Sequence, residues 1–145
     1  MDRGGAMVGI VVFTHGSVAT GLVETARTIL GDCPGLVAVE LDPDLDRQSA
    51  WARLDTALAA ADSGGGVIVL VDMFGGTPSN LAMARLADGD VEVVTGVNLA
   101  MVLRAAQRRP SLGLSELAAD VVAYGRRNVT SSAGWLRTPA AAPAT

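Results

Sequence analysis

The sequence contains one histidine, His15, at a position where chemistry is expected. It follows the apolar run 7–13 and precedes Gly16 and an amphipathic segment at 18–30, a pattern that predicts a strand, a tight turn and a helix. Ligands of open α/β sheets bind at the carboxyl ends of such strands. An imidazole placed there can act as a nucleophile, a base or a metal ligand.

A second apolar run, 66–71, ends in the same way, with Asp72 directly after it. The runs 7–13 and 66–71 are the most continuously apolar in the chain, so we expect both strands in the centre of the sheet. Neighbouring parallel strands would bring His15 and Asp72 to the same rim. A carboxylate that accepts a hydrogen bond from one ring nitrogen exposes the lone pair of the other. It also stabilises the cation formed when that nitrogen attacks an electrophile.

The loops beside these two residues favour an anionic reaction partner. Gly16 and the pair Gly75-Gly76 allow backbone amides to approach an anion closely. The helix expected after Ser17 adds the positive end of its dipole, and Ser17 and Thr77 supply hydroxyl groups. A nucleophilic nitrogen among such groups suits a phosphoryl group better than an acyl group.

Less specific interpretations of the same residues stay open at this stage. A lone histidine is often a cap or a satisfied core group, Asp72 can cap a turn, and Thr77 and Asn98 can each cap a helix. A metal site is not expected, because only one carboxylate accompanies the histidine. A nucleotide site is not indicated, because the sequence has neither a Walker pattern nor Gly-x-Gly-x-x-Gly. We therefore expect no metal and no cofactor.

Composition narrows the class of protein. The 145 residues suffice for one domain, and with half of them hydrophobic but only 3% aromatic, its core must consist of Val, Leu, Ile and Ala. The net charge of −4 does not suit a nucleic-acid-binding protein. The single Cys33 excludes an internal disulfide and fits a reducing compartment.

The region 4–23 lacks charged residues but is not expected to span a membrane. It contains five glycines, and its apolar run has only the length of a strand. A signal peptide is not expected either, because Asp2 stands beside Arg3 and no small-residue cleavage site follows cleanly. We therefore expect a cytoplasmic protein.

Hydrophobic periodicity and capping residues predict alternating strands and helices, and hence an α/β fold with a mainly parallel open sheet and helices on both faces. Asp46 caps one of the predicted helices, and Gly125 is expected to stop another. Residues 1–6 are interpreted as an extension, 7–132 as the domain, and 133–145 as an Ala/Pro-rich tail or linker. The expected strands are 7–13, 36–41, 66–71, 91–95 and a short fifth at 128–131; the expected helices are 18–30, 47–61, 81–87 opened by 77–80, 98–108 and 115–124.

Three segments resemble the IIA component of the mannose family of the bacterial phosphoenolpyruvate-dependent sugar phosphotransferase system. They are Gly-Ile-Val-Val-Phe-Thr-His-Gly at 9–16 with Gly-Asp downstream at 31–32, Val-Asp-Met-Phe-Gly-Gly-Thr-Pro-Ser-Asn at 71–80, and Val-Thr-Gly-Val-Asn at 94–98 followed by Met101. The likeness runs from about residue 7 to 129, in order and with similar spacing. Thr-His-Gly after a strand, together with Asp-x-x-Gly-Gly-[Ser/Thr]-Pro-x-Asn, is a specific combination.

The resemblance implies a role for each residue of the site. His15 matches the phosphorylated histidine of the family, and Asp72 matches the aspartate that orients it, so that the phosphoryl group would sit on Nε2. Thr77 matches a Ser/Thr position beside the site. The residues that match the surrounding loops are Thr14, Gly16, Gly75 and Gly76.

The resemblance also implies an architecture and partners. The family has four parallel strands in the order 2-1-3-4, and a fifth, antiparallel strand is exchanged between the subunits of a homodimer; residues 128–131 would be that strand. The phosphoryl donor would be HPr and the acceptor a IIB component, which some members carry after an Ala/Pro-rich linker like the tail seen here. We therefore expect a phosphotransferase that acts as a phosphocarrier in sugar uptake and that reaches a membrane permease only through its partners.

Two departures from the family pattern and three alternatives accompany this expectation. The family often has tryptophan where Phe74 stands and proline near Ala100, which leaves the preference for partners open. Relatives include a domain that phosphorylates dihydroxyacetone kinase subunits, and proteins whose phosphorylation state acts as a regulatory signal. The alternatives are these two roles and a non-catalytic ligand-binding domain of flavodoxin-like shape.

Overall fold

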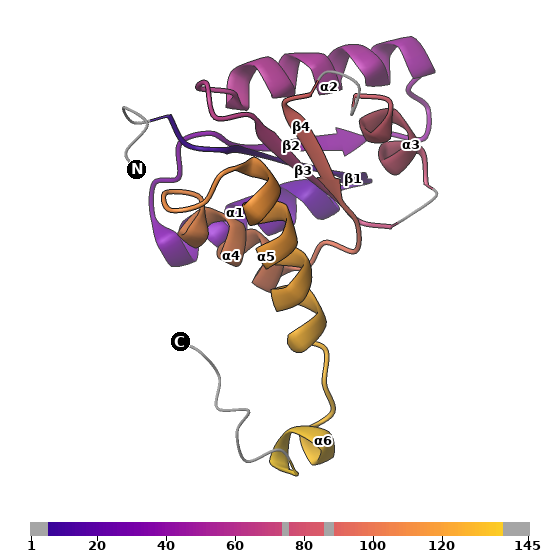
Figure 1. Ribbon diagram of the computed structural model, residues 1–145. Helices are drawn as coiled ribbons and strands as arrows, with labels where there is room; N and C mark the ends of the chain where they lie inside the picture. The colour runs from indigo at the N-terminus through magenta and orange to yellow at the C-terminus, as the bar shows by residue number, and fades with distance from the viewer. Residues whose placement is uncertain (1–5, 74–75, 86–88, 138–145) are drawn as a thin grey trace.

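The computed structural model describes residues 6–73, 76–85 and 89–137 and contains a four-stranded parallel sheet (Figure 1). Its strands are β1 (Gly9–His15), β2 (Leu36–Leu41), β3 (Val67–Val71) and β4 (Val91–Val94). Their order is β2-β1-β3-β4, as the family resemblance implies. The two central strands, β1 and β3, are those that the sequence placed in the centre. Their apolar side chains are fully buried because helices cover both faces.

Alternation along β1 divides the core into two layers. Ile10 and Val12 pack with one set of helices, and Val11 and Phe13 pack with the other. The first layer consists of α1 (Val18–Leu30), α4 (Leu99–Arg108) and α5 (Leu114–Arg127), and the second of α2 (Arg47–Ala61) and α3 (Thr77–Met83), as Figure 1 shows. A last short helix, α6 (Ser132–Leu136), lies apart from both layers.

Two helices begin at the capping residues expected from the sequence. The Asp46 carboxylate accepts a hydrogen bond from the Ser49 amide at 2.7 Å and starts α2. The Asn98 side chain accepts one from the Met101 amide at 2.9 Å and starts α4. Each cap satisfies an amide that would otherwise lack a partner in the first turn.

A buried arginine side chain links two strands at the end of the sheet that lies away from His15. Arg109, which follows α4, is 5% exposed, and its guanidinium donates to the carbonyl oxygens of Val8 and Pro34 at 3.3 and 2.6 Å. These carbonyls precede β1 and β2. Arg109 therefore joins the amino ends of two neighbouring strands, on the side of the sheet away from His15.

Two helix boundaries differ from the sequence prediction. The third helix opens at Thr77 with Pro78 in its first turn, as the sequence predicted, and differs at its other end. It ends at Met83, and residues 86–87 of the predicted helix lie outside the described residues. The prediction that Gly125 stops α5 is wrong. A Cβ at Gly125 would lie 2.8 Å from the Met101 sulfur, so this glycine lets α5 pack closely on α4, and the helix continues to Arg127.

The predicted fifth strand at 128–131 is absent from the described chain. These residues form a turn and an irregular exposed segment, and the chain continues past α5 away from the sheet (Figure 1). A strand needs an edge to pair with, and this segment does not run along one. The predicted tail begins within α6, and most of it, 138–145, lies outside the described residues, as do 1–5 of the predicted extension. Within the described ranges, no helix combines the length and apolarity needed to cross a membrane.

Two glycine substitutions test the packing of β1 and α2. A Cβ at Gly9 would lie 2.3 Å from the Ala61 carbonyl oxygen, whereas a Cβ at Gly21, inside α1, meets nothing within 4 Å. We expect Gly9→Ala to lower the free energy of unfolding by about 1–3 kcal/mol through overpacking. We expect Gly21→Ala to raise it by about 0.5–1 kcal/mol through helix propensity. Urea unfolding measures both, and a neutral Gly9→Ala would contradict the close approach.

Candidate active site

The candidate reactive residue, His15, is the last residue of a central strand. The side chains of β1 are buried up to and including Thr14, and the next residue, His15, leaves the core with 46% of its side chain exposed. Phe13 pairs in register with Val71 of β3, so the residues that follow these two strands emerge at the same rim. The imidazole is therefore carried by rigid backbone and is open to solvent.

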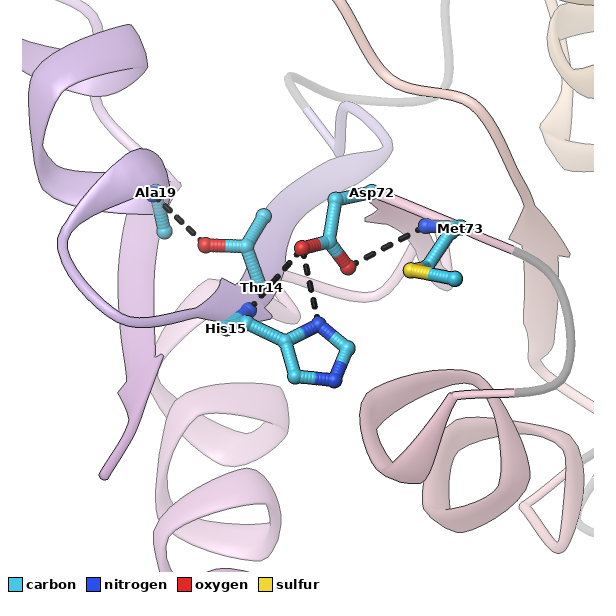
Figure 2. Close-up of polar contacts among 5 residues, drawn as sticks. All are labelled: Thr14, His15, Ala19, Asp72 and Met73. Atoms are coloured by element: carbon cyan, nitrogen blue, oxygen red, sulfur yellow. Dashed lines mark hydrogen bonds and ion pairs between the residues drawn. The ribbon is translucent and has the colours of Figure 1, made fainter. Parts of the chain in front are cut away.

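Asp72 contacts His15 twice through a single oxygen (Figure 2). Its Oδ2 accepts the His15 backbone amide at 3.1 Å and lies 2.9 Å from Nδ1 of the ring. Its Oδ1 accepts the amide of Met73 at 3.1 Å. An ionised carboxylate only accepts hydrogen bonds, so the proton of a neutral imidazole sits on Nδ1 and the lone pair is on Nε2.

The environment of Asp72 keeps its carboxyl group ionised. Partial burial raises the pKa of Asp72, but four smaller influences together lower it by more: the hydrogen bonds from the ring and backbone of His15, the charge of that ring and a backbone hydrogen bond of Asp72 itself. The pKa therefore lies below its ordinary value. At neutral pH the group is therefore an anion. This is the state in which it can hold Nδ1–H and offset a positive charge on the ring.

Gly76 is the second residue that confines the imidazole of His15. A Cβ at Gly76 would lie 2.7 Å from Cε1 of His15 and 3.2 Å from Nε2, so the ring lies against the backbone of this residue. The φ and ψ of Gly76, −78° and 170°, are open to any residue. Glycine is thus required here by the nearness of the imidazole and not by backbone conformation. Asp72 and Gly76 confine the ring from two sides, with Nε2 on the side of Gly76.

The other predicted site residues differ in their burial and in their hydrogen bonds. Thr14 is buried, and its hydroxyl accepts the Ala19 amide at 2.7 Å, so it caps α1 and does not line the site surface (Figure 2). Ser17 occupies the N-cap position, but its side chain makes no capping hydrogen bond. The capping role of Thr14 is not predictable from the sequence, because Thr14 stands outside the usual cap spacing.

The remaining predicted loop residues are neighbours of His15 or Gly76 in the sequence. Gly16 adopts a positive φ of 52°, which turns the backbone from β1 into α1. Thr77 is the first residue of α3 and follows Gly76 directly. Gly75 and Phe74 lie outside the described residues. Among the described residues, no group of three or more His, Cys, Asp or Glu side chains is placed to hold a metal ion.

Comparison with known proteins identifies the family. The family described as "PTS system fructose IIA component" matches residues 9–122, which include both His15 and Asp72. The chain belongs to this family. The assignment to the mannose-family IIA components of the phosphotransferase system, made from the sequence motifs, is confirmed.

Individual relatives of this IIA protein support the assignment. The chain is 33% identical over 126 residues to the mannose-specific EIIAB component of Escherichia coli K12, a match that covers 84% of this chain but 38% of that protein. It thus spans well under half the length of this relative. It is 29% identical over 123 residues to the fructose-specific EIIA component of Bacillus subtilis 168, covering 84% of each.

Solved structures of IIA proteins share the fold. The mannose/sorbose-specific IIA subunit from Enterococcus faecalis superposes with a TM-score of 0.78 at 29% identity, covering 86% of this chain and 94% of that one. The EIIA component from Streptococcus agalactiae superposes with a TM-score of 0.80 at 21% identity and covers 88% of this chain and 98% of that one.

A double-mutant cycle tests the contact between Gly76 and the imidazole. Gly76→Ala should lower the free energy of unfolding by about 1 kcal/mol or more, because the new methyl group displaces the ring from Asp72. In a His15→Ala background, where no ring is present, the same change should cost less. Chemical denaturation of the four proteins measures the coupling, which we expect within about 0.5–3 kcal/mol. Equal costs in both backgrounds would show that Gly76 does not confine His15.

Proposed function

We propose that this IIA protein is a phosphocarrier that accepts a phosphoryl group from phospho-HPr on Nε2 of His15 and passes it to a IIB component in sugar uptake. One observation carries the proposal. Oδ2 of Asp72 lies 2.9 Å from Nδ1, which orients the ring and leaves the opposite nitrogen as the nucleophile on an exposed face. The family match over 9–122 supports the same chemistry.

The reaction follows from the two sides of the ring. The Nε2 lone pair of His15 attacks the phosphorus, the phosphorus–nitrogen bond of the donor breaks, and the donor ring leaves with that electron pair. The His15 ring becomes a phosphorylated cation that keeps its proton on Nδ1. The Asp72 carboxylate offsets this charge, in a charge-assisted hydrogen bond worth about 1.5–3 kcal/mol. Transfer to the acceptor reverses these steps, so the phosphohistidine is an intermediate.

The neighbouring backbone supplies the stabilisation of the phosphoryl oxygens. Gly76 lies close to Nε2, and its missing side chain leaves room for the incoming group. Backbone amides of the turn after His15 and of the segment that enters α3, with the hydroxyls of Ser17 and Thr77, serve as hydrogen-bond donors in this proposal. The Gly16 amide itself donates to the Leu41 carbonyl oxygen at 3.1 Å. Such fixed donors act on charge that develops during transfer without needing a metal ion.

Phosphorylation by purified components tests the proposed function. With phosphoenolpyruvate, the general phosphotransferase enzyme and HPr, the protein should acquire an adduct that is labile in acid and stable in alkali. His15→Ala should acquire none. Asp72→Asn should keep its fold and react about 100-fold more slowly or worse, because its amide permits the wrong tautomer. Radiolabelled phosphate follows the adduct. Labelling of His15→Ala would refute the carrier role, and an unchanged rate in Asp72→Asn would refute the role of Asp72.

We also propose that the protein is a homodimer in which residues 128–137 of each copy cover the free edge of β4 in the other. A hollow of about 540 Å³ lies along this edge, between α3 and α5, with Val93, Met101 and Val122 in its lining. Beyond α5, apolar side chains stand in solvent: Val129 is 77% exposed and Leu136 72%. Covering both surfaces would bury apolar area and protect an edge strand.

Truncation tests the dimer. The intact chain should show twice its 14.7 kDa mass in light scattering. Removal of residues 128–145 should give monomers because it deletes the covering segment. Removal of 138–145 alone is the matched control and should leave the dimer intact. A monomeric full-length chain, or a dimer that survives the longer deletion, would contradict the proposal.

A further inference from the structure

The position of Gly76 beside the imidazole depends on a short helix. Gly76 directly precedes α3, which has seven residues and is too short to be stable by itself. Leu81 and Ala82 anchor the middle of α3 in the core. The position of Gly76 relative to His15 is therefore set by what holds α3 in place.

Arg85 lies in the turn just after α3, and its backbone amide donates to the Ala82 carbonyl oxygen at 2.9 Å. Its guanidinium carbon lies 4.0 Å from the centroid of the Trp51 ring, and its Nη2 forms an ion pair with Asp55. Trp51 and Asp55 stand four residues apart on α2, so they share one face of that helix. A planar guanidinium satisfies both partners at once, which an ammonium group cannot do. Figure 1 shows α3 close to α2 on the same face of the sheet.

The Arg85 contact is more than a solvated surface pair. The Arg85 side chain is 19% exposed, and its Nε is buried without a hydrogen-bond partner. An unpaired buried N–H is costly, so the side chain is held there by the stack and the ion pair against that cost. Through these two contacts, Arg85 links the end of α3 to α2.

We propose that Arg85 is a positioning residue for the phosphoryl-transfer site: it fixes α3 to α2 and thereby keeps Gly76 against the His15 ring. The link runs from Trp51 and Asp55 through Arg85 and α3 to the backbone that faces Nε2. The effect on transfer rests on the proposed function, whereas the effect on the ring is independent of it. Arg85 itself touches no reacting atom.

The chain contains a matched control for this contact. Arg104 of α4 makes two hydrogen bonds to Asp120 of α5, at 2.8 and 3.2 Å, and its guanidinium lies 4.5 Å from the ring centroid of Tyr124. It therefore loses the same kinds of contact as Arg85 when it is truncated. However, it joins α4 to α5, which pack on the other face of the sheet from α2 and α3.

The experiment compares Arg85→Ala with Arg104→Ala by kinetics and by NMR. Arg85→Ala should lower the maximal rate of His15 phosphorylation by about tenfold or more, with little change in the HPr concentration that gives half the rate, because a small misplacement of the site slows transfer. His15 is the only histidine, so its Cε1–H resonance is unambiguous, and it should shift in Arg85→Ala. Arg104→Ala should change neither quantity. Arg85→Lys keeps the ion pair and should restore part of the rate.

Each outcome decides the proposal. If the ring resonance and the maximal rate of Arg85→Ala match those of Arg104→Ala, the positioning role is refuted. If Arg85→Ala does not fold, Arg85→Lys and Trp51→Leu replace it, and unchanged values in both also refute the role. If the wild-type protein is not phosphorylated, the proposed function fails. The ring resonance then still shows whether Arg85 governs the site.

Discussion

The hydrogen bond between Asp72 and His15 is the interaction on which the site depends. One carboxylate oxygen receives both the ring nitrogen and the backbone amide of the same residue, so it fixes the imidazole at two points. Because the carboxyl group is ionised, the contact also decides which nitrogen carries the proton. Without it, the ring would be a half-exposed side chain with no contact that selects the Nδ1–H tautomer.

That contact exists because β1 and β3 are neighbours in a parallel sheet. Their side chains are buried on both faces, and their registered pairing ends at the same rim. Arg109 fastens the other end of the sheet by joining the amino ends of β1 and β2. The two ends of the sheet thus differ: at one end a buried guanidinium links the strands, and at the other His15 is exposed to solvent.

Most of the fold and the central pair of the site could be predicted from the sequence, because the signals are local. Apolar runs identified β1 and β3 as central, Asp46 and Asn98 marked the starts of their helices, and the chain after each strand pointed to His15 and Asp72. These features depend on residue type and short spacing. Tertiary contacts hardly alter them.

The features that were missed depend on contacts between distant segments. Gly125 reads as a helix stop, yet it lies inside α5 because Met101 packs against it. The Arg85 contact with Trp51 joins two helices far apart in the sequence, and no local pattern marks it. The segment 128–131 was predicted to be a strand, but in the single chain it runs away from the sheet and pairs with neither edge. In each case the outcome depends on contacts that are made, or not made, between distant segments.

The placement of the histidine at the tip of β1 also limits how the protein can be controlled. Ile10, Val11, Val12 and Phe13 are completely buried, so the ring is attached to one of the stiffest parts of the molecule. The chain cannot withdraw this imidazole without disrupting the central sheet. In the proposed carrier, throughput is then governed from outside, by how much donor and acceptor are present and how often each reaches this rim.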